Sequence, residues 1–392
     1  MTTQNLPLSG VRVVEMTHMV MGPTCGMILA QLGAEVIKVE PPAGDKTRSL
    51  GGMGTSFFPL FNRGKRSVVL DFAKPEDRET MQRLLASADV FLENFRDGQL
   101  EKQGLGTEEL RRKHPHLIVA GHKGFLSGPY EHRPALDEVV QMMSGLAAMT
   151  GTLEKPQRVG SSANDIMGGM FGVISILAAL HQKRSSGKGA DIRIGLFENC
   201  LFLVAQHMVE YEMTGNKPRS MPEREHAWPI YDIFDTAGGE RMFIGVVTEG
   251  HWQSFCREFG LQEFSDDPTL RTTTDRILAR AKIIPRVAEV IRQWNAAELS
   301  AKLDRLNICF SPINRPEDLL SDPHVLRPGG LVNNVNADGA AFRVPALPVQ
   351  WNGANLGEGL KVPALGADTD AVRAELDTEK VSPIAKTAVR LA

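Results

Sequence analysis

A regular alternation of short apolar runs and helical segments, from residue 11 to residue 120, is the feature that most constrains the fold. The apolar runs are rich in β-branched residues, and the segments between them carry helix-start and helix-stop signals such as Pro23, Gly33 and Pro75. Strands that alternate with helices at this spacing favour an α/β fold, with a large Rossmann-like domain built on a doubly wound parallel sheet. We expect strands at residues 11–15, 35–39, 67–70, 90–93 and 117–120, and helices at residues 23–32, 75–85 and 107–113.

Doubly wound sheets bind ligands beyond the carboxyl ends of their strands, here the loops at residues 17–22, 94–98 and 121–128. Residues 17–23 read THMVMGP, so the first loop lacks the GxGxxG pattern of dinucleotide-binding folds. Glu40 stands where a ribose-binding acid is found in such folds, but without the glycines it is weak support. A nucleotide redox cofactor is therefore not expected.

The sequence pattern changes after about residue 224. Residues 230–234 and 242–247 predict a β-hairpin, and helical patterns follow at residues 250–259, 276–294 and 297–306. The chain is accordingly divided into a large α/β domain, a smaller α+β domain and a C-terminal segment that returns to the large domain. The predicted boundaries are residues 1–224, 225–322 and 323–392, with a tail helix at residues 369–376.

Composition excludes several classes of partner. The 392 residues carry a net charge of −3, so there is no basic field that would favour nucleic acid. The first residues lack the features of a secretion signal, and no apolar run reaches membrane-spanning length, so we expect a cytoplasmic protein with no membrane partner. The four cysteines include no CxxC pair and the ten histidines show no ligand spacing, so no bound metal is expected.

Asp165 stands where an apolar helix begins, and we expect this helix to continue to about residue 184. Apolar side chains occupy nearly every face of the helix, which is typical of a buried helix. A carboxylate at the mouth of a buried helix is partly desolvated and can act as a covalent nucleophile toward activated acyl groups. It can equally be an N-cap that accepts backbone N–H groups, and the helix pattern alone favours that role.

Several motifs in a fixed order distinguish these roles. They read LSGVRVVE at residues 8–15, LGAEVIKVE at 32–40, GDKTR at 44–48, ENFRDG at 93–98, KGF at 123–125, RPALD at 133–137 and SGKG at 186–189. Their order and spacing resemble the class III CoA-transferases, also called the formyl-CoA transferase or carnitine dehydratase/bile-acid-inducible protein family. The resemblance extends over nearly the whole chain, and Asp165 falls at the position of the family's catalytic aspartate.

The resemblance implies an interlocked homodimer, in which two chains thread through each other. It also implies positions that bind coenzyme A, namely Met19, Leu70, Asn94, Phe95, Lys102 and Lys123. The chain departs from the family at Pro41, where an arginine often stands, so phosphate contact is expected from Lys46 or Arg48 instead. The glycine-rich loop of formyl-CoA transferases is also missing between residues 210 and 260.

The activity implied is CoA transfer from an acyl-CoA to a free carboxylic acid, through an aspartyl-acyl anhydride and an aspartyl-CoA thioester on Asp165. Gly168 and Gly169 are expected to let the backbone approach the intermediate and donate N–H groups to its oxyanions. An α-methylacyl-CoA racemase of the same fold is the alternative, but it needs a second base, and Leu136 occupies that histidine's position. A non-catalytic acyl-CoA binding protein is a further alternative, although it would have no use for Asp165.

The acceptor acid cannot be read from the motifs. Residues that could pair with its carboxylate are His18, Arg48, Arg133 and His226, each of which is also an ordinary surface or structural side chain. His122 follows a predicted strand, and we place it in the strand-loop before Lys123, outside the chemistry.

Overall fold

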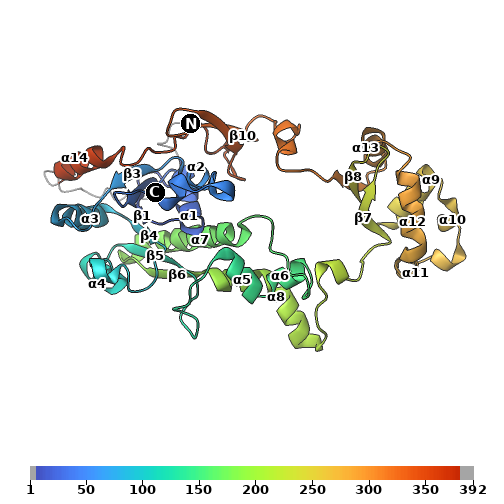
Figure 1. The fold of residues 1–392 in the computed structure, drawn as a ribbon, viewed down its shortest axis with the longest axis horizontal. Coiled ribbons are helices and arrows are strands. Elements are labelled where there is room, and N and C mark those ends of the chain that lie inside the picture. Colours follow the sequence, from blue (N-terminus) through green and yellow to red (C-terminus); the bar gives the residue numbers. More distant parts are fainter. Residues whose placement is uncertain (1–5, 380–392) are drawn as a thin grey trace. The chain divides into compact units, whose positions relative to one another are not determined.

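The computed structural model describes residues 6–379 and divides into two compact units. The larger unit comprises the residues up to Pro222 together with those from Leu326 onward, and the smaller unit is Glu223–Val325 (Figure 1). The predicted boundaries lie after residues 224 and 322. The end of the predicted C-terminal segment, residues 380–392, lies outside the described residues.

A six-stranded parallel sheet forms the centre of the larger unit, with the strand order β3-β2-β1-β4-β5-β6. This sheet confirms the predicted α/β fold, and the winding changes direction between β1 and β4. The sixth strand was not predicted, because its residues alternate between polar and apolar at an edge of the sheet. The strands are β1 (Arg12–Met16), β2 (Glu35–Glu40), β3 (Arg66–Val69), β4 (Val90–Glu93), β5 (Ile118–Lys123) and β6 (Asp191–Gly195).

Helices cover both faces of this sheet. Successive strand residues point to opposite faces, so Val13 joins one core cluster while Val14 joins the other. One cluster is completed by α1 (Met21–Gln31) and α7 (Ala163–Ser186). The other is completed by α3 (Pro75–Ser87), α4 (Thr107–Lys113) and α14 (Thr369–Glu379). Burial on both faces explains the continuous apolar runs of the strands.

The C-terminal segment packs against the β3 edge of the sheet. The backbone N–H of Ser67 donates to Asp368 at 2.9 Å, and Arg66 forms an ion pair with Glu375 at 2.8 Å. The other elements of the larger unit are α2 (Phe57–Asn62), α5 (Asp137–Met143), α6 (Leu146–Thr150), α8 (Leu196–Thr214), β10 (Leu331–Val335), β11 (Ala341–Pro345), β12 (Gln350–Trp351) and β13 (Ala354–Asn355).

The smaller unit joins an antiparallel sheet of order β7-β8-β9 to five helices around its own apolar core. The predicted hairpin is present, but its third strand, β9, was not expected. The helix predicted at residues 276–294 is two helices, because the chain turns at Ala279. The elements are β7 (Ile230–Asp235), β8 (Arg241–Val246), α9 (Glu249–Glu258), α10 (Gln262–Ser265), α11 (Thr273–Leu278), α12 (Arg280–Ile291), α13 (Ala296–Arg305) and β9 (Cys309–Pro312).

Helix α7 is not buried on every face, contrary to the expectation from its composition. Its small residues pack against α1 and the sheet, whereas Met170, Ile174 and Leu177 are exposed, Ile174 to 59%. Exposed apolar side chains continue along the neighbouring helix α8, where Phe202 is 67% exposed. By length and composition alone α7 could cross a membrane, a test that core helices also pass. No segment among residues 6–379 covers this apolar face.

A buried cluster of charges lies under the loop that follows β1. Lys65 Nζ lies 2.8 Å from Glu15 Oε1, and Lys38 Nζ lies 2.9 Å from Asp45 Oδ2 and 3.6 Å from Glu15. Burial lowers the pKa of Lys65 to about 8. Lys38 also donates to the carbonyl of Thr17 at 2.7 Å, and the Thr17 hydroxyl donates to Glu15. The cluster therefore fixes the first residue of the loop.

Substitution Gly26→Ala should lower the free energy of unfolding by about 3 kcal/mol. An added Cβ would lie 1.7 Å from Glu15 Oε2, and the buried carboxylate cannot retreat without leaving Lys65. Urea denaturation followed by circular dichroism measures the change. Gly51→Ala is the matched control, because its backbone φ is −88° and nothing lies within 4 Å of the added methyl group. Equal losses in the two variants would contradict the explanation.

Candidate active site

A cavity of about 290 Å³ opens at the carboxyl ends of β1, β4 and β5, where the winding of the sheet changes direction. Four of the side chains predicted from sequence line it, namely Met19, Asn94, Lys123 and Asp165. The structure thus brings together residues from four separate parts of the chain. The wall also contains His18, His122, Leu136, Asp137, Glu138 and Arg158.

Asn94 joins the two loops that meet at the change of winding. Its side-chain oxygen accepts the backbone N–H of His18 at 3.0 Å, and its amide donates to the His18 carbonyl at 2.8 Å. The next residue, Met19, is held at φ +64°, a left-handed conformation that is uncommon for a residue with a side chain. Such strain persists only where the surroundings enforce it, and it is frequent at ligand sites.

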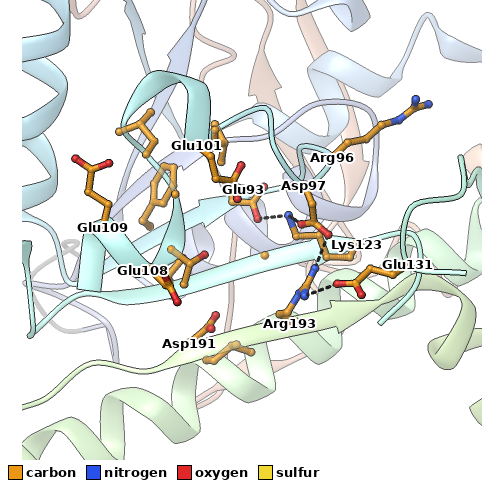
Figure 2. Close-up of a pocket in the computed structure, with 18 of the residues that line it drawn as sticks. Glu93, Arg96, Asp97, Glu101, Glu108, Glu109, Lys123, Glu131, Asp191 and Arg193 are labelled. Atoms are coloured by element: carbon orange, nitrogen blue, oxygen red, sulfur yellow. Dashed lines mark hydrogen bonds and ion pairs between the residues drawn. The ribbon is translucent and has the colours of Figure 1, made fainter. Parts of the chain in front are cut away.

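Lys123 is held by groups of the protein itself. Its ammonium lies 2.8 Å from Glu93 and 3.1 Å from Asp97 (Figure 2). It also donates to the Phe95 carbonyl at 2.8 Å. Burial raises the pKa of Glu93 even though Lys123 opposes the shift. A phosphate would therefore have to displace Asp97 in order to reach this ammonium.

A second cavity, of about 460 Å³, lies over β4, β5 and β6 (Figure 2). Its cations are Arg96, Lys123 and Arg193, and Arg193 is paired with Asp97 at 2.8 Å and Glu131 at 3.0 Å. The wall repels phosphate because most of its charged side chains are acidic. These acids are Glu93, Asp97, Glu101, Glu108, Glu109, Glu131 and Asp191. The cavity around Asp165 is therefore the better candidate.

Three of the predicted coenzyme A residues do not present their side chains to the Asp165 cavity. Leu70 is 1% exposed in the core, so it could reach a ligand only through its backbone. Lys102 is exposed on a short 3₁₀ turn. Phe95 packs against the core, and its ring centroid lies 5.7 Å from that of His18. Their roles in binding coenzyme A stay predictions.

Arg48 is engaged and cannot take the place of the missing arginine at position 41. Its guanidinium makes two 2.7 Å hydrogen bonds to Glu40 and one of 3.0 Å to the Pro363 carbonyl. Lys46 is exposed. Burial lowers the pKa of His18 and the charge of Lys46 adds to this shift, so Lys46 lies near the cavity. Of the two cations predicted to contact phosphate, Lys46 is thus the available one.

The other two residues considered for the acceptor carboxylate lie elsewhere. Arg133 is exposed and stacks on Tyr130, with 4.8 Å between the guanidinium carbon and the ring centroid. His226 belongs to the smaller unit. Of the original four, only His18 lines the cavity.

Asp165 is not the N-cap of α7, because Ser162 occupies that position and Asp165 is the third residue of the helix. Its half-buried carboxylate makes no hydrogen bond within the described part of the chain. Burial raises the pKa of Asp165 to about 7; the charge of Asp137 adds to the shift, and Arg158 opposes it. A carboxylate of this kind is both unengaged and more basic than an ordinary aspartate, as a nucleophile requires.

Gly168 and Gly169 allow α7 to lie against α1. A Cβ at residue 169 would approach the Met21 carbonyl to 2.8 Å and Thr24 Cβ to 2.7 Å. Both glycines lie beyond the first turn of α7, where N–H groups serve the helix itself; the Ile166 N–H already bonds the Ser162 carbonyl at 2.9 Å. The N–H groups that the helix itself does not use are those of the first turn, and among them the Asp165 N–H acts on Asp137. The oxyanion role of the glycines stays a prediction that this geometry does not favour.

Sequence reasoning missed three residues of the wall. His122 lies on β5 rather than outside the site, and burial lowers its pKa to about 4, so the ring is neutral. Asp137 and Arg158 form an ion pair at 3.4 Å beside Asp165. Asp137 is the last residue of the RPALD motif. Arg158 lies in a segment without helix or strand signals, so only the folded chain shows that it lines the cavity.

Comparisons with known proteins agree with the motifs. The family model of CoA-transferase family III matches residues 8–369. The chain belongs to CoA-transferase family III. The resemblance found in the sequence is therefore confirmed, and the protein is an enzyme of this class, which uses acyl-CoA as substrate.

Curated relatives and a solved structure cover almost the whole chain. The succinyl-CoA–D-citramalate CoA-transferase of Chloroflexus aurantiacus is 32% identical over 90% of this chain and 92% of its own length. The succinate–glutarate CoA-transferase of Agrobacterium fabrum is 31% identical over 96% of this chain and 98% of its own length. A crystal structure of a CAIB/BAIF family protein from Brucella suis has a TM-score of 0.85 and 34% identity, and covers 95% of this chain and 100% of its own. These likenesses support CoA transfer as the family activity.

Substitution Asp165→Asn should stabilise the protein at pH 8, by on the order of 3 kcal/mol. The folded site raises the pKa of Asp165 from 3.8 to about 7, so this group's contribution to stability is present below pH 4 and lost as the pH rises through 7. Urea unfolding at several pH values should show a gain that shrinks toward pH 4. Asp191→Asn, at an exposed strand end, controls for the loss of one charge. A gain independent of pH would contradict the prediction.

Proposed function

We propose that the enzyme transfers CoA from an acyl-CoA donor to a free carboxylic acid through covalent intermediates on Asp165. The observation that carries the proposal is the Asp165 carboxylate, which is half-buried, makes no hydrogen bond within residues 6–379 and lines the cavity at the change of winding. Its pKa of about 7 supports the same role, because a more basic carboxylate is a better nucleophile.

The reaction proceeds by exchange of activated acyl bonds. An Asp165 oxygen bonds to the thioester carbonyl carbon, the C–S bond breaks, and the electron pair leaves with CoA thiolate. The thiolate then attacks the aspartyl carbonyl, which gives an aspartyl-CoA thioester and the free donor acid. The acceptor carboxylate runs the same steps in reverse, so ATP is not required. N–H groups in the first turn of α7 are the donors best placed for the oxyanions, and water must be excluded from the anhydride.

We further propose that donor and acceptor are dicarboxylic acids or their CoA esters. The two relatives described above are named for succinate or succinyl-CoA with D-citramalate or glutarate, all of them dicarboxylic. His18 is the wall residue that can meet a second carboxylate, since Lys123 and Arg158 are already paired. The enzyme is expected to act in the cytoplasm.

Coenzyme A is proposed to enter along the loops after β1 and β4. Met19 and Asn94 line this path, and Lys46 supplies an exposed cation near His18. Lys102 adds a second exposed cation, and Leu70 can contribute only its backbone. Phe95 and Lys123 then act mainly by shaping the loop, through the hydrogen bond between them.

The racemase alternative has one observation in its favour, since His122 lines the same cavity as Asp165. The ring is 3% exposed, and burial lowers its pKa to about 4, so it is a weak base at neutral pH. Leu136 occupies the position of the racemase histidine, is 64% exposed and has no titratable group that could exchange a proton. Transfer is therefore the better supported activity.

A homodimer is proposed from the apolar face of α7 and α8. Met170, Ile174, Phe202 and Met213 are each about half or more exposed, and a contiguous patch of this kind marks an interaction site. A second copy of the chain is the occupant that the family resemblance implies.

Dilution should not dissociate the protein. Threaded chains separate only by unfolding, so sedimentation velocity from micromolar to nanomolar concentration should give the mass of a dimer throughout. A folded monomer at nanomolar concentration would contradict the threaded arrangement, while leaving the role of Asp165 untouched.

Substitution Asp165→Asn should reduce exchange of CoA between succinyl-CoA and glutarate at least 1,000-fold, on the order of 4 kcal/mol in the barrier, since an amide cannot form the anhydride. Mass spectrometry of products after isotope labelling of one acid measures the exchange. Hydroxylamine added during turnover should leave a hydroxamate on the peptide that contains Asp165. Asp191→Asn is the control and should transfer normally. Near wild-type transfer by Asp165→Asn would refute the mechanism.

A further inference from the structure

Asp137 is a second buried carboxylate in the wall of the cavity, and the transfer steps do not use it. It is the first residue of α5 and is 9% exposed. Its Oδ2 accepts a 2.7 Å hydrogen bond from Gln141 Nε2 and lies 3.4 Å from Arg158 Nη2. Burial raises the pKa of Asp137, although Gln141, Arg158 and the backbone N–H of Asp165 oppose the shift.

These contacts hold the segment that leads into α7. Gln141 Oε1 accepts the Val159 N–H at 2.9 Å, and Arg158 donates to the carbonyls of Val159 at 3.2 Å and Ser161 at 3.1 Å. Residues 158–161 are thus fixed to α5 through Asp137 and Gln141. The helix that carries Asp165 begins two residues later, so the position of its first turn depends on this contact.

Two charged side chains shift the pKa of Asp165. Among the groups that surround it, Asp137 raises the pKa of Asp165 and Arg158 lowers it. The His122 ring is neutral because burial lowers its pKa to about 4. Titratable and charged groups lie on the elements that surround α7. The α5 helix and the segment before α7 present Asp137, Glu138 and Arg158. The remaining groups are His18 after β1, Cys25 on α1, His122 and Lys123 on β5, Arg193 on β6 and Glu198 on α8.

We propose that Asp137 is a positioning residue, which fixes the first turn of α7 and sets a negative charge against the Asp165 carboxylate. The inference rests on the proposed role of Asp165 as nucleophile. When Asp165 attacks the thioester, a C–O bond forms, the C–S bond breaks, and the negative charge leaves as CoA thiolate. The anhydride on Asp165 is neutral, so repulsion from Asp137 is relieved in that step. Asp137 thereby favours the acylated enzyme over the free carboxylate.

The test is a titration that needs no substrate. In protein labelled with ¹³C at the aspartate carboxyl carbon, the Asp165 resonance is the one missing from Asp165→Asn. Asp137→Asn keeps the shape of the side chain but removes its charge, so the titration midpoint of Asp165 should fall by at least one pH unit. Arg158→Gln should raise the midpoint. Asp191→Asn is the matched control, because it removes one exposed carboxylate that does not line the Asp165 cavity and should leave the midpoint in place.

An unchanged midpoint in Asp137→Asn would overturn the inference. If that variant fails to fold, Asp137→Ser, which also removes the charge, takes its place, and an unchanged midpoint there overturns the inference equally. The pH profile of kcat/KM for CoA exchange separates the inference from the proposed function. Transfer whose pH midpoint moves with the ¹³C midpoint supports both, and transfer with an unmoved ¹³C midpoint refutes the inference alone. A moved ¹³C midpoint with no transfer from any acyl-CoA donor refutes the proposed function, and with it the catalytic advantage assigned to Asp137.

Discussion

The buried cluster of Glu15, Lys38, Lys65 and Asp45 is the constraint on which the ligand-binding edge depends. Two carboxylates and two ammonium groups leave water together, and each is tolerated only because the others are present. The cluster joins β1, β2, the turn at Asp45 and the residue before β3, and through Thr17 it anchors the loop that carries Met19. Such ion pairs contribute little net stability, but removing one partner leaves an uncompensated charge, so the arrangement is specified sharply.

A second constraint sets the distance between this loop and Asp165. Glycine at residue 169 brings α7 against α1, and α1 follows directly from the anchored loop. The first turn of α7 therefore opens on the same cavity as the loops after β1 and β4. The basicity of Asp165 arises from this placement, because burial and the nearby Asp137 disfavour its charge. The same close packing that builds the fold therefore raises the proton affinity of the Asp165 carboxylate, because it excludes water from the group.

The sequence predicted those parts that depend on local pattern. The five strands from β1 to β5 were found because buried parallel strands are apolar throughout, whereas β6 alternates at an edge and was missed. The motifs identified Asp165, but they could not predict that Arg48 is paired with Glu40 or Lys123 with Glu93 and Asp97, since these partners meet only when separate loops fold together. Arg158 was missed for the same reason. The solvent exposure of α7 also could not be predicted, because composition shows that a helix is apolar but not which segment covers it.

The apolar face of α7 and α8 has a consequence for biosynthesis. Residues 163–214 form these two helices, and no part of residues 6–379 covers Ile174 or Phe202, so the growing chain exposes both side chains from the time they are made. Exposed apolar surface of this extent promotes aggregation, and the cell counters it with chaperones. The yield of folded enzyme is then set by competition between folding and aggregation, a kinetic limit that the stability of the finished protein does not reveal.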